Sequence, residues 1–70
     1  MPLTEIKQGH TGLIKSVLGS DKTKKFLFSL GCSEGEEITI ISKLAGNYVV
    51  NIKDSRYAID KKMAKLIEIV

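Results

Sequence analysis

Only one segment of this 70-residue chain has the pattern of an α-helix, and this limits the folds that are open to it. A parallel sheet needs a crossover helix between its strands, and a single helix cannot supply several crossovers. The rest of the chain contains short apolar runs separated by about 10–15 residues, which is typical of strands. The pattern therefore predicts a mostly-β fold, a small five-stranded barrel with one inserted α-helix. The predicted strands are residues 13–18, 36–43, 48–53, 56–59 and 66–70.

The predicted helix spans residues 21–30. Ser20 or Asp21 can cap its start, because either side chain can accept a hydrogen bond from a free amide of the first turn. Gly31 can end it, since glycine adopts the left-handed conformation at low cost. A helix of about ten residues is too short to persist alone, so we expect its apolar stripe to pack on the sheet. That stripe consists of Thr23, Phe26, Leu27 and Leu30.

Strand alternation and turn residues complete the predicted layout. In the first strand, Ile14, Ser16 and Leu18 share one side, and Leu13, Lys15 and Val17 share the other. Turns are predicted at Ala45-Gly46-Asn47 and at Asp54-Ser55, and Asp60 can cap a short helical turn over residues 61–64. Closure of the barrel would pair most strand edges and so help a core this small.

Composition bounds the class of protein. Cys32 is the only cysteine, so the chain cannot form an internal disulfide, and a lone thiol fits a reducing compartment. No run approaches about 18 apolar residues, and the first residues lack the basic and apolar regions of a signal peptide. We therefore expect residues 1–70 to form one cytoplasmic domain that stands alone.

The residues that could carry chemistry are few, and we expect no enzyme, no metal site and no cofactor. Cys32 follows the predicted end of the helix, where a small apolar side chain would plug the core, and His10 lies in a glycine-flanked loop. An enzyme using Cys32 and His10 would require the fold to bring the two together. The acidic turn over residues 34–37 lacks the spacing of a calcium loop, although weak binding of a divalent ion there stays open. The glycines at 9 and 12 precede a strand, whereas a phosphate-binding loop precedes a helix.

The net charge of +3 hides an uneven distribution. Basic residues outnumber acidic ones on both sides of the acidic turn, and all but one of the eleven basic residues are lysine. This shortage of arginine counts against specific reading of nucleic acids.

Phe28 lies about 160° around the helix from Leu30 and so faces away from the predicted core. It either anchors a partner beside Lys24 and Lys25 or is covered by the N-terminal segment.

The order of motifs along the chain resembles the FeoA family, ferrous iron transport protein A. The hallmark of that family is a helix that ends in Leu-Gly, then an apolar residue, a spacer and Pro-Gly. Residues 30–33 match this pattern, whereas Glu34 replaces the proline and Asp60 stands where leucine is common. The other matching positions are Gly9, Gly12, Ile14, Leu27, Gly35, Ile38-Thr39-Ile40, Tyr57-Ala58-Ile59, Met63-Ala64 and Ile67-Glu68-Ile69.

The resemblance implies an SH3-like barrel and a role beside FeoB, the membrane Fe(II) transporter with a cytosolic GTP-binding domain. The resemblance also suggests a GTPase-activating role. Such activators often supply an arginine finger to the GTPase. Arg56, the sole arginine, lies outside the Leu-Gly helix, so the sequence gives this role little support. The same domain occurs at the C-terminus of iron-dependent repressors, whose DNA-binding and metal-binding regions are missing here.

The residues and the resemblance together point to one docking face, formed by the helix and the loop after it. We expect Lys24, Lys25 and Phe28 to contact the partner, and Gly31 and Gly35 to set the backbone. A second hypothesis, from another class, is a small barrel that binds RNA through its lysines. Exposed strand edges also leave weak self-association open.

Overall fold

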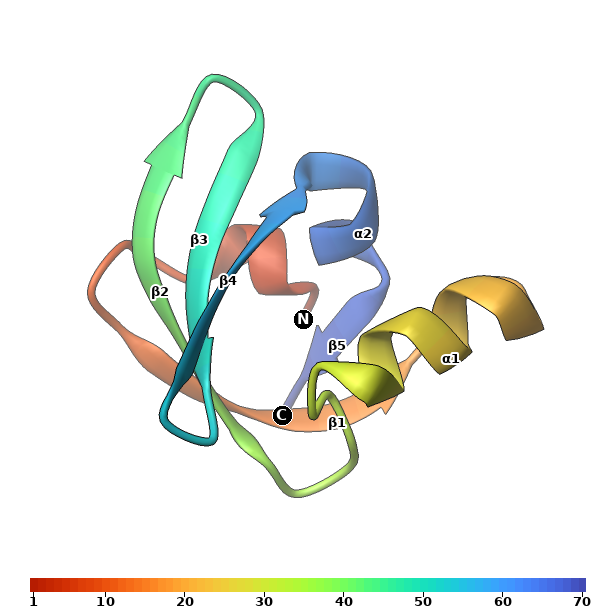
Figure 1. The fold of residues 1–70 in the computed structure, drawn as a ribbon. Coiled ribbons are helices and arrows are strands. Elements are labelled where there is room, and N and C mark those ends of the chain that lie inside the picture. The colour runs from red at the N-terminus through yellow and green to blue at the C-terminus, as the bar shows by residue number, and fades with distance from the viewer.

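The computed structural model of the chain describes all residues, 1–70, as a strongly curved antiparallel sheet around one apolar core (Figure 1). Its strands are β1 (Thr11–Val17), β2 (Glu37–Leu44), β3 (Asn47–Ile52), β4 (Ser55–Asp60) and β5 (Ile67–Ile69). Its helices are a 3-10 turn η1 (Leu3–Glu5), α1 (Asp21–Ser29) and a single turn α2 (Lys61–Lys65). The predicted mostly-β fold is confirmed, and α2 is the short turn expected after Asp60, whose carboxylate accepts from the Met63 amide at 2.8 Å.

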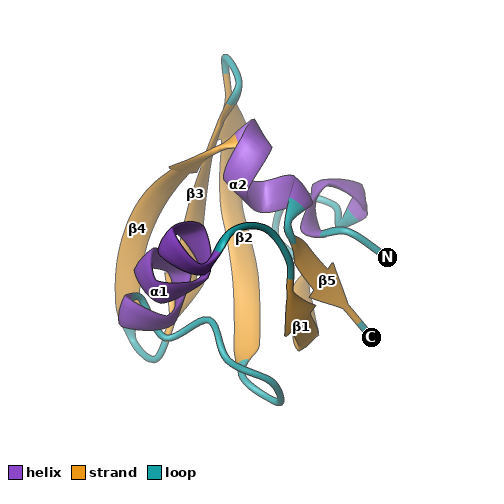
Figure 2. Ribbon diagram, turned by 90° about the vertical axis from the view of Figure 1, so that its right-hand side faces the viewer, coloured by secondary structure: helices purple, strands orange, loops and turns teal.

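The hydrogen-bonded order of the strands is β4-β3-β2-β1-β5, so β4 and β5 form the two edges. The predicted closure of the barrel is therefore incomplete, because these two strands do not pair with each other. Helices fill the gap between them instead: α2 contacts both β4 and β5, and α1 lies in front of the opening in Figure 2. One side chain from each helix, Leu27 and Ala64, is fully buried in the core.

β1 differs from the simple alternation expected of it. Ile14 and Val17 are both buried, while Leu18 is exposed. The pairing with β5 shifts register between Ile14 and Ser16, which marks a bulge or similar irregularity. Such an irregularity adds a residue to one strand, so the side chains after it exchange faces. The sequence alternation could not reveal this change.

The two hairpins turn through two-residue loops. Lys53 and Asp54 connect β3 to β4, one residue earlier than predicted, and both have positive φ, 49° and 65°. Ala45 and Gly46 connect β2 to β3 in the same way, with φ of 44° and 83°. Positive φ at both central positions is the mark of type I′ turns, whose twist matches that of the strands.

The end of α1 is fixed by a pair of backbone hydrogen bonds. The Cys32 amide donates to the Leu27 carbonyl at 3.0 Å, and the Gly31 amide donates to the Phe28 carbonyl at 2.9 Å. This is a Schellman motif, and Gly31 takes its left-handed position with φ of 104°, as predicted. A Cβ at this position would also lie 3.0 Å from Ile52 Cγ2. Glycine is thus required both by the backbone and by the packing of α1 on β3.

Gly31→Ala should destabilise the protein by more than Gly35→Ala, measured by urea denaturation. Both glycines have positive φ, so alanine costs roughly 1–2 kcal/mol at either position. Only Gly31 meets a neighbour, because nothing lies within 4 Å of a Cβ at Gly35. Equal losses for the two variants would show that the contact with Ile52 contributes nothing.

Candidate partner interface on helix α1

α1 is attached to the sheet by its C-terminal end, and its N-terminal end projects away from the strands (Figure 1). Ser20 caps the start of the helix, since its hydroxyl oxygen accepts from the Thr23 amide at 3.2 Å. Leu27 is the only fully buried side chain of the helix. Because only the last turn is held, most of the surface of α1 faces solvent.

The predicted apolar stripe is confirmed in part. Leu27 is buried, and Thr23 and Leu30 are half-buried. Phe26, however, leaves 45% of its surface exposed, so its placement in the core was wrong. It lies at the margin of the stripe, and the projection of the helix leaves no sheet residue to cover it.

Phe28 is exposed, as its position around the helix predicted. The exposed fraction is 52%, which is large for an aromatic side chain. The alternative, that the N-terminal segment covers it, is wrong. That segment runs along β5 instead, where Pro2 forms a β-bridge with Glu68 and Leu3 enters the core.

Lys24 and Lys25 flank this aromatic ring on the outer side of α1. Lys24 lies one helical turn before Phe28 and therefore on the same side of the helix. Lys25 is exposed and Lys24 is half-buried. Neither ammonium group forms an ion pair within the chain, whose ion pairs are Met1–Glu68 and Lys53–Glu36. We call Lys24, Lys25 and Phe28 the α1 face.

Gly35, the other predicted site residue, lies at the far end of the loop. Its amide donates to the Ile14 carbonyl at 2.8 Å, and its φ is +86°. Rather than joining the α1 face, it lines an open polar pocket of about 360 Å³ with residues of β2 and of the β3–β4 hairpin. The structure therefore brings Lys24, Lys25 and Phe28 together on α1, places Gly31 just beyond the C-cap of that helix, and leaves Gly35 beside a different surface feature.

The polar pocket was not foreseen from the sequence, because its walls come from segments that are distant along the chain. Lys53 and Glu36 face each other in it at 3.5 Å, and no apolar residue lines it. No three His, Cys, Asp or Glu side chains in the structure are grouped so that they could hold a metal ion. The remaining lining residues are Glu37, Thr39, Asn51 and Asp54.

Cys32 and His10 occupy different environments. The Cys32 thiol is fully buried, and desolvation by burial raises its pKa to about 11. A reactive cysteine needs the opposite shift, toward the thiolate. His10 is exposed and its side chain makes no hydrogen bond. The prediction of a buried structural thiol is confirmed.

Burial of Cys32 should make stability fall at high pH. Between pH 9 and 11 the unfolded thiol ionises while the folded thiol keeps its proton, so ionisation favours unfolding. The free energy of unfolding should therefore decrease with pH more steeply than in Cys32→Ala, by at most about 1.4 kcal/mol per pH unit. Equal slopes for the two proteins, followed by chemical denaturation, would contradict the raised pKa.

None of the helices is long and apolar enough to cross a membrane. A comparison with curated proteins gives no match. Among solved structures, a manganese-dependent transcriptional repressor has the same fold, with a TM-score of 0.87 at 19% identity. This chain is covered completely in that comparison and spans 40% of the repressor.

Solved FeoA proteins resemble the chain over almost all of its length. An iron uptake regulatory protein (FeoA) has a TM-score of 0.89 and 26% identity, covering 99% of this chain and 92% of its own. Iron(II) transport protein A from Clostridium thermocellum has 28% identity and the same TM-score, covering 99% of this chain and 44% of its own. FeoA from Stenotrophomonas maltophilia, solved with zinc and described as an SH3 domain protein, has a TM-score of 0.89 at 24% identity, covering 100% of this chain and 89% of its own. The FeoA domain family matches residues 1–70, and the chain therefore belongs to the FeoA family.

Proposed function

We propose that this protein is a non-enzymatic accessory component of ferrous iron uptake. In this proposal residues 1–70 act as one module in the cytoplasm and dock on the cytosolic part of a FeoB-type transporter. The α1 face makes the contact, and iron is the cargo of the partner. Membership of the FeoA family, which is linked to ferrous iron transport, supports the choice of process.

The observation that carries the proposal is the exposed ring of Phe28 on a helix whose orientation is fixed. Exposed aromatic side chains are typical anchors of protein interfaces, because they bury a large area on binding. The burial of Leu27 and the Schellman motif at Gly31 prevent α1 from rolling to bury Phe28 within the chain. The ring is thus held ready for a partner.

The charges beside Phe28 indicate the chemistry of that partner. Lys24 and Lys25 form no ion pair within the chain, so they are free to pair with carboxylates on another protein. Such charges speed association and set orientation more than they add affinity. Arg56 lies on β4 rather than on α1, so the proposed face supplies no arginine finger to a GTPase.

Reversal of both charges, by Lys24→Glu with Lys25→Glu, should weaken binding to the cytosolic domain of the transporter at low salt by at least about tenfold. The matched control is Lys61→Glu with Lys62→Glu, which makes the same charge change on two adjacent exposed lysines of α2. Isothermal titration calorimetry would measure both affinities. An equal loss for the two double variants would mean that net charge, and not the α1 face, governs binding.

Phe28→Ala should reduce the affinity by about tenfold or more, because the ring is proposed to fill an apolar pocket of the partner. Stability should change by no more than about 0.5 kcal/mol, since the side chain is mostly exposed. Leu27→Ala is the contrasting variant and should cost about 2–5 kcal/mol of stability. A large drop in the Tm of Phe28→Ala would contradict the proposed role.

A further inference from the structure

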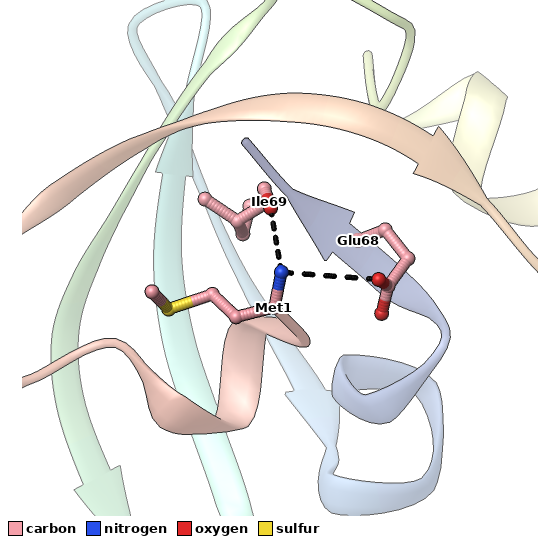
Figure 3. A network of polar contacts seen from close by, with 3 residues as sticks. All are labelled: Met1, Glu68 and Ile69. Atoms are coloured by element: carbon pink, nitrogen blue, oxygen red, sulfur yellow. Dashed lines mark hydrogen bonds and ion pairs between the residues drawn. The ribbon is translucent and has the colours of Figure 1, made fainter.

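The two edges of the sheet are treated differently in this fold. β5 is covered by the N-terminal segment (Figure 3): the Met1 ammonium donates to the Ile69 carbonyl at 2.8 Å and lies 3.8 Å from the Glu68 carboxylate. The Ile69 amide in turn donates to the Met1 carbonyl at 2.6 Å. No segment of the chain pairs with the outer edge of β4 in this way, although α2 contacts the strand, and β4 lies at the outer margin of the sheet in Figure 2. Open edges of this kind are templates for pairing with another strand.

The pairing of β4 with β3 determines which of its backbone groups are free. Across a two-residue loop the flanking residues, Ile52 and Ser55, exchange hydrogen bonds, and the bonded pairs then recur at every second residue. Lys61 continues this every-second-residue series beyond the end of β4, and its amide donates to the Gly46 carbonyl at 2.9 Å. The amides and carbonyls of Arg56, Ala58 and Asp60 therefore point away from β3. Arg56 and Ala58 form no backbone hydrogen bond with a turn, loop or cap residue, whereas the Asp60 carbonyl, at the N-cap of α2, accepts the first hydrogen bond of that helix.

We propose that the β4 edge pairs with the β4 edge of a second copy of this chain. The two strands would run antiparallel about a two-fold axis at Ala58, so that Ala58 faces Ala58 and Arg56 faces Asp60 of the other copy. The amides of these three residues and the carbonyls of Arg56 and Ala58 would then form the new ladder. Each dimer would gain two pairs of opposite charges on the solvent side of the sheet, where all three side chains are exposed.

Charge complementarity singles out this register. In other registers the backbone groups that point away from β3 also face each other, but the side chains are matched differently. Three of these registers place like charges opposite each other: Arg56 with Arg56, Asp60 with Asp60, or Asp60 with Asp54. Like charges directly opposite each other destabilise a strand pair. The remaining shift, with Ala58 facing Asp60, places Arg56 opposite Lys62 and shortens the ladder. Only the register centred on Ala58 pairs Arg56 with Asp60 twice.

The other face of β4 fits the same register. Tyr57 and Ile59 point toward the core, and Ile59 is buried while Tyr57 is half-buried. In the proposed pair Tyr57 of each copy lies opposite Ile59 of the other. Aromatic and β-branched residues opposite each other are a favourable cross-strand pair. The inference is independent of the proposed function, because no residue of β4 belongs to the α1 face.

Sedimentation equilibrium of the purified protein at low salt, at concentrations up to about 1 mM, tests the proposal. We expect a concentration-dependent dimer that Arg56→Glu weakens by about tenfold or more, because that variant is acidic at both paired positions. Lys15→Glu is the matched control, with the same charge change at an exposed position of β1, and should dimerise normally. No dimer in the native protein, or a dimer that Arg56→Glu leaves intact, overturns the proposal.

A mixture of variants tests the register itself. Asp60→Lys is basic at both positions, so it should not pair with itself. It should pair with Arg56→Glu through the native Arg56–Asp60 ion pair and one new ion pair between the two substituted positions. Because Asp60 also caps α2, circular dichroism must first show that Asp60→Lys is folded. If it is not, amide exchange of the native protein decides: exchange at Ala58 should slow as the protein concentration rises. The register is overturned if the folded variants form no mixed dimer, or if the amide exchange rate at Ala58 does not change with protein concentration.

Discussion

The structure depends on β1, which belongs to two halves of the sheet at once. Its first half pairs with β2 and its second half pairs with β5, with a shift of register between Ile14 and Ser16. This shift lets one strand bend across the molecule and bury both Ile14 and Val17. Gly12 permits the close passage of β5, since a Cβ there would lie 2.6 Å from Ile69 Cγ2. A core of fourteen residues is enclosed in this way without any buried polar side chain.

Curvature alone leaves the sheet open, and the helices complete the enclosure. α2 lies against both edge strands, whereas α1 contributes Leu27 and then projects into solvent. A helix held only by its last turn needs a firm termination, which the Schellman motif at Gly31 provides. The same arrangement that stabilises the core therefore displays Phe28 and two lysines. Stability and the proposed interface depend on one short segment, from Leu27 to Cys32.

Much of the fold was accessible from local sequence, because local physics sets it. Ser20 and Gly31 bound α1 through capping and left-handed backbone geometry, and both act as predicted. Strand positions followed from the apolar runs to within one or two residues. The exposure of Phe28 followed from helical periodicity. Phe26 was misplaced because periodicity gives the direction of a side chain but not how far the sheet extends beneath it.

The sequence by itself determined the type and order of the strands and of α1 and α2, the buried thiol of Cys32 and the resemblance to FeoA, since each depends on neighbouring residues or their order. The tertiary structure decided the rest. The bulge in β1, the cover on β5 and the open edge of β4 all arise from pairing between segments far apart in the chain. The separation of Gly35 from the α1 face has the same origin, because the loop after α1 is tied to β1 at Ile14. Long-range backbone hydrogen bonds leave no mark in local sequence, so only the folded chain reveals which surfaces they leave free.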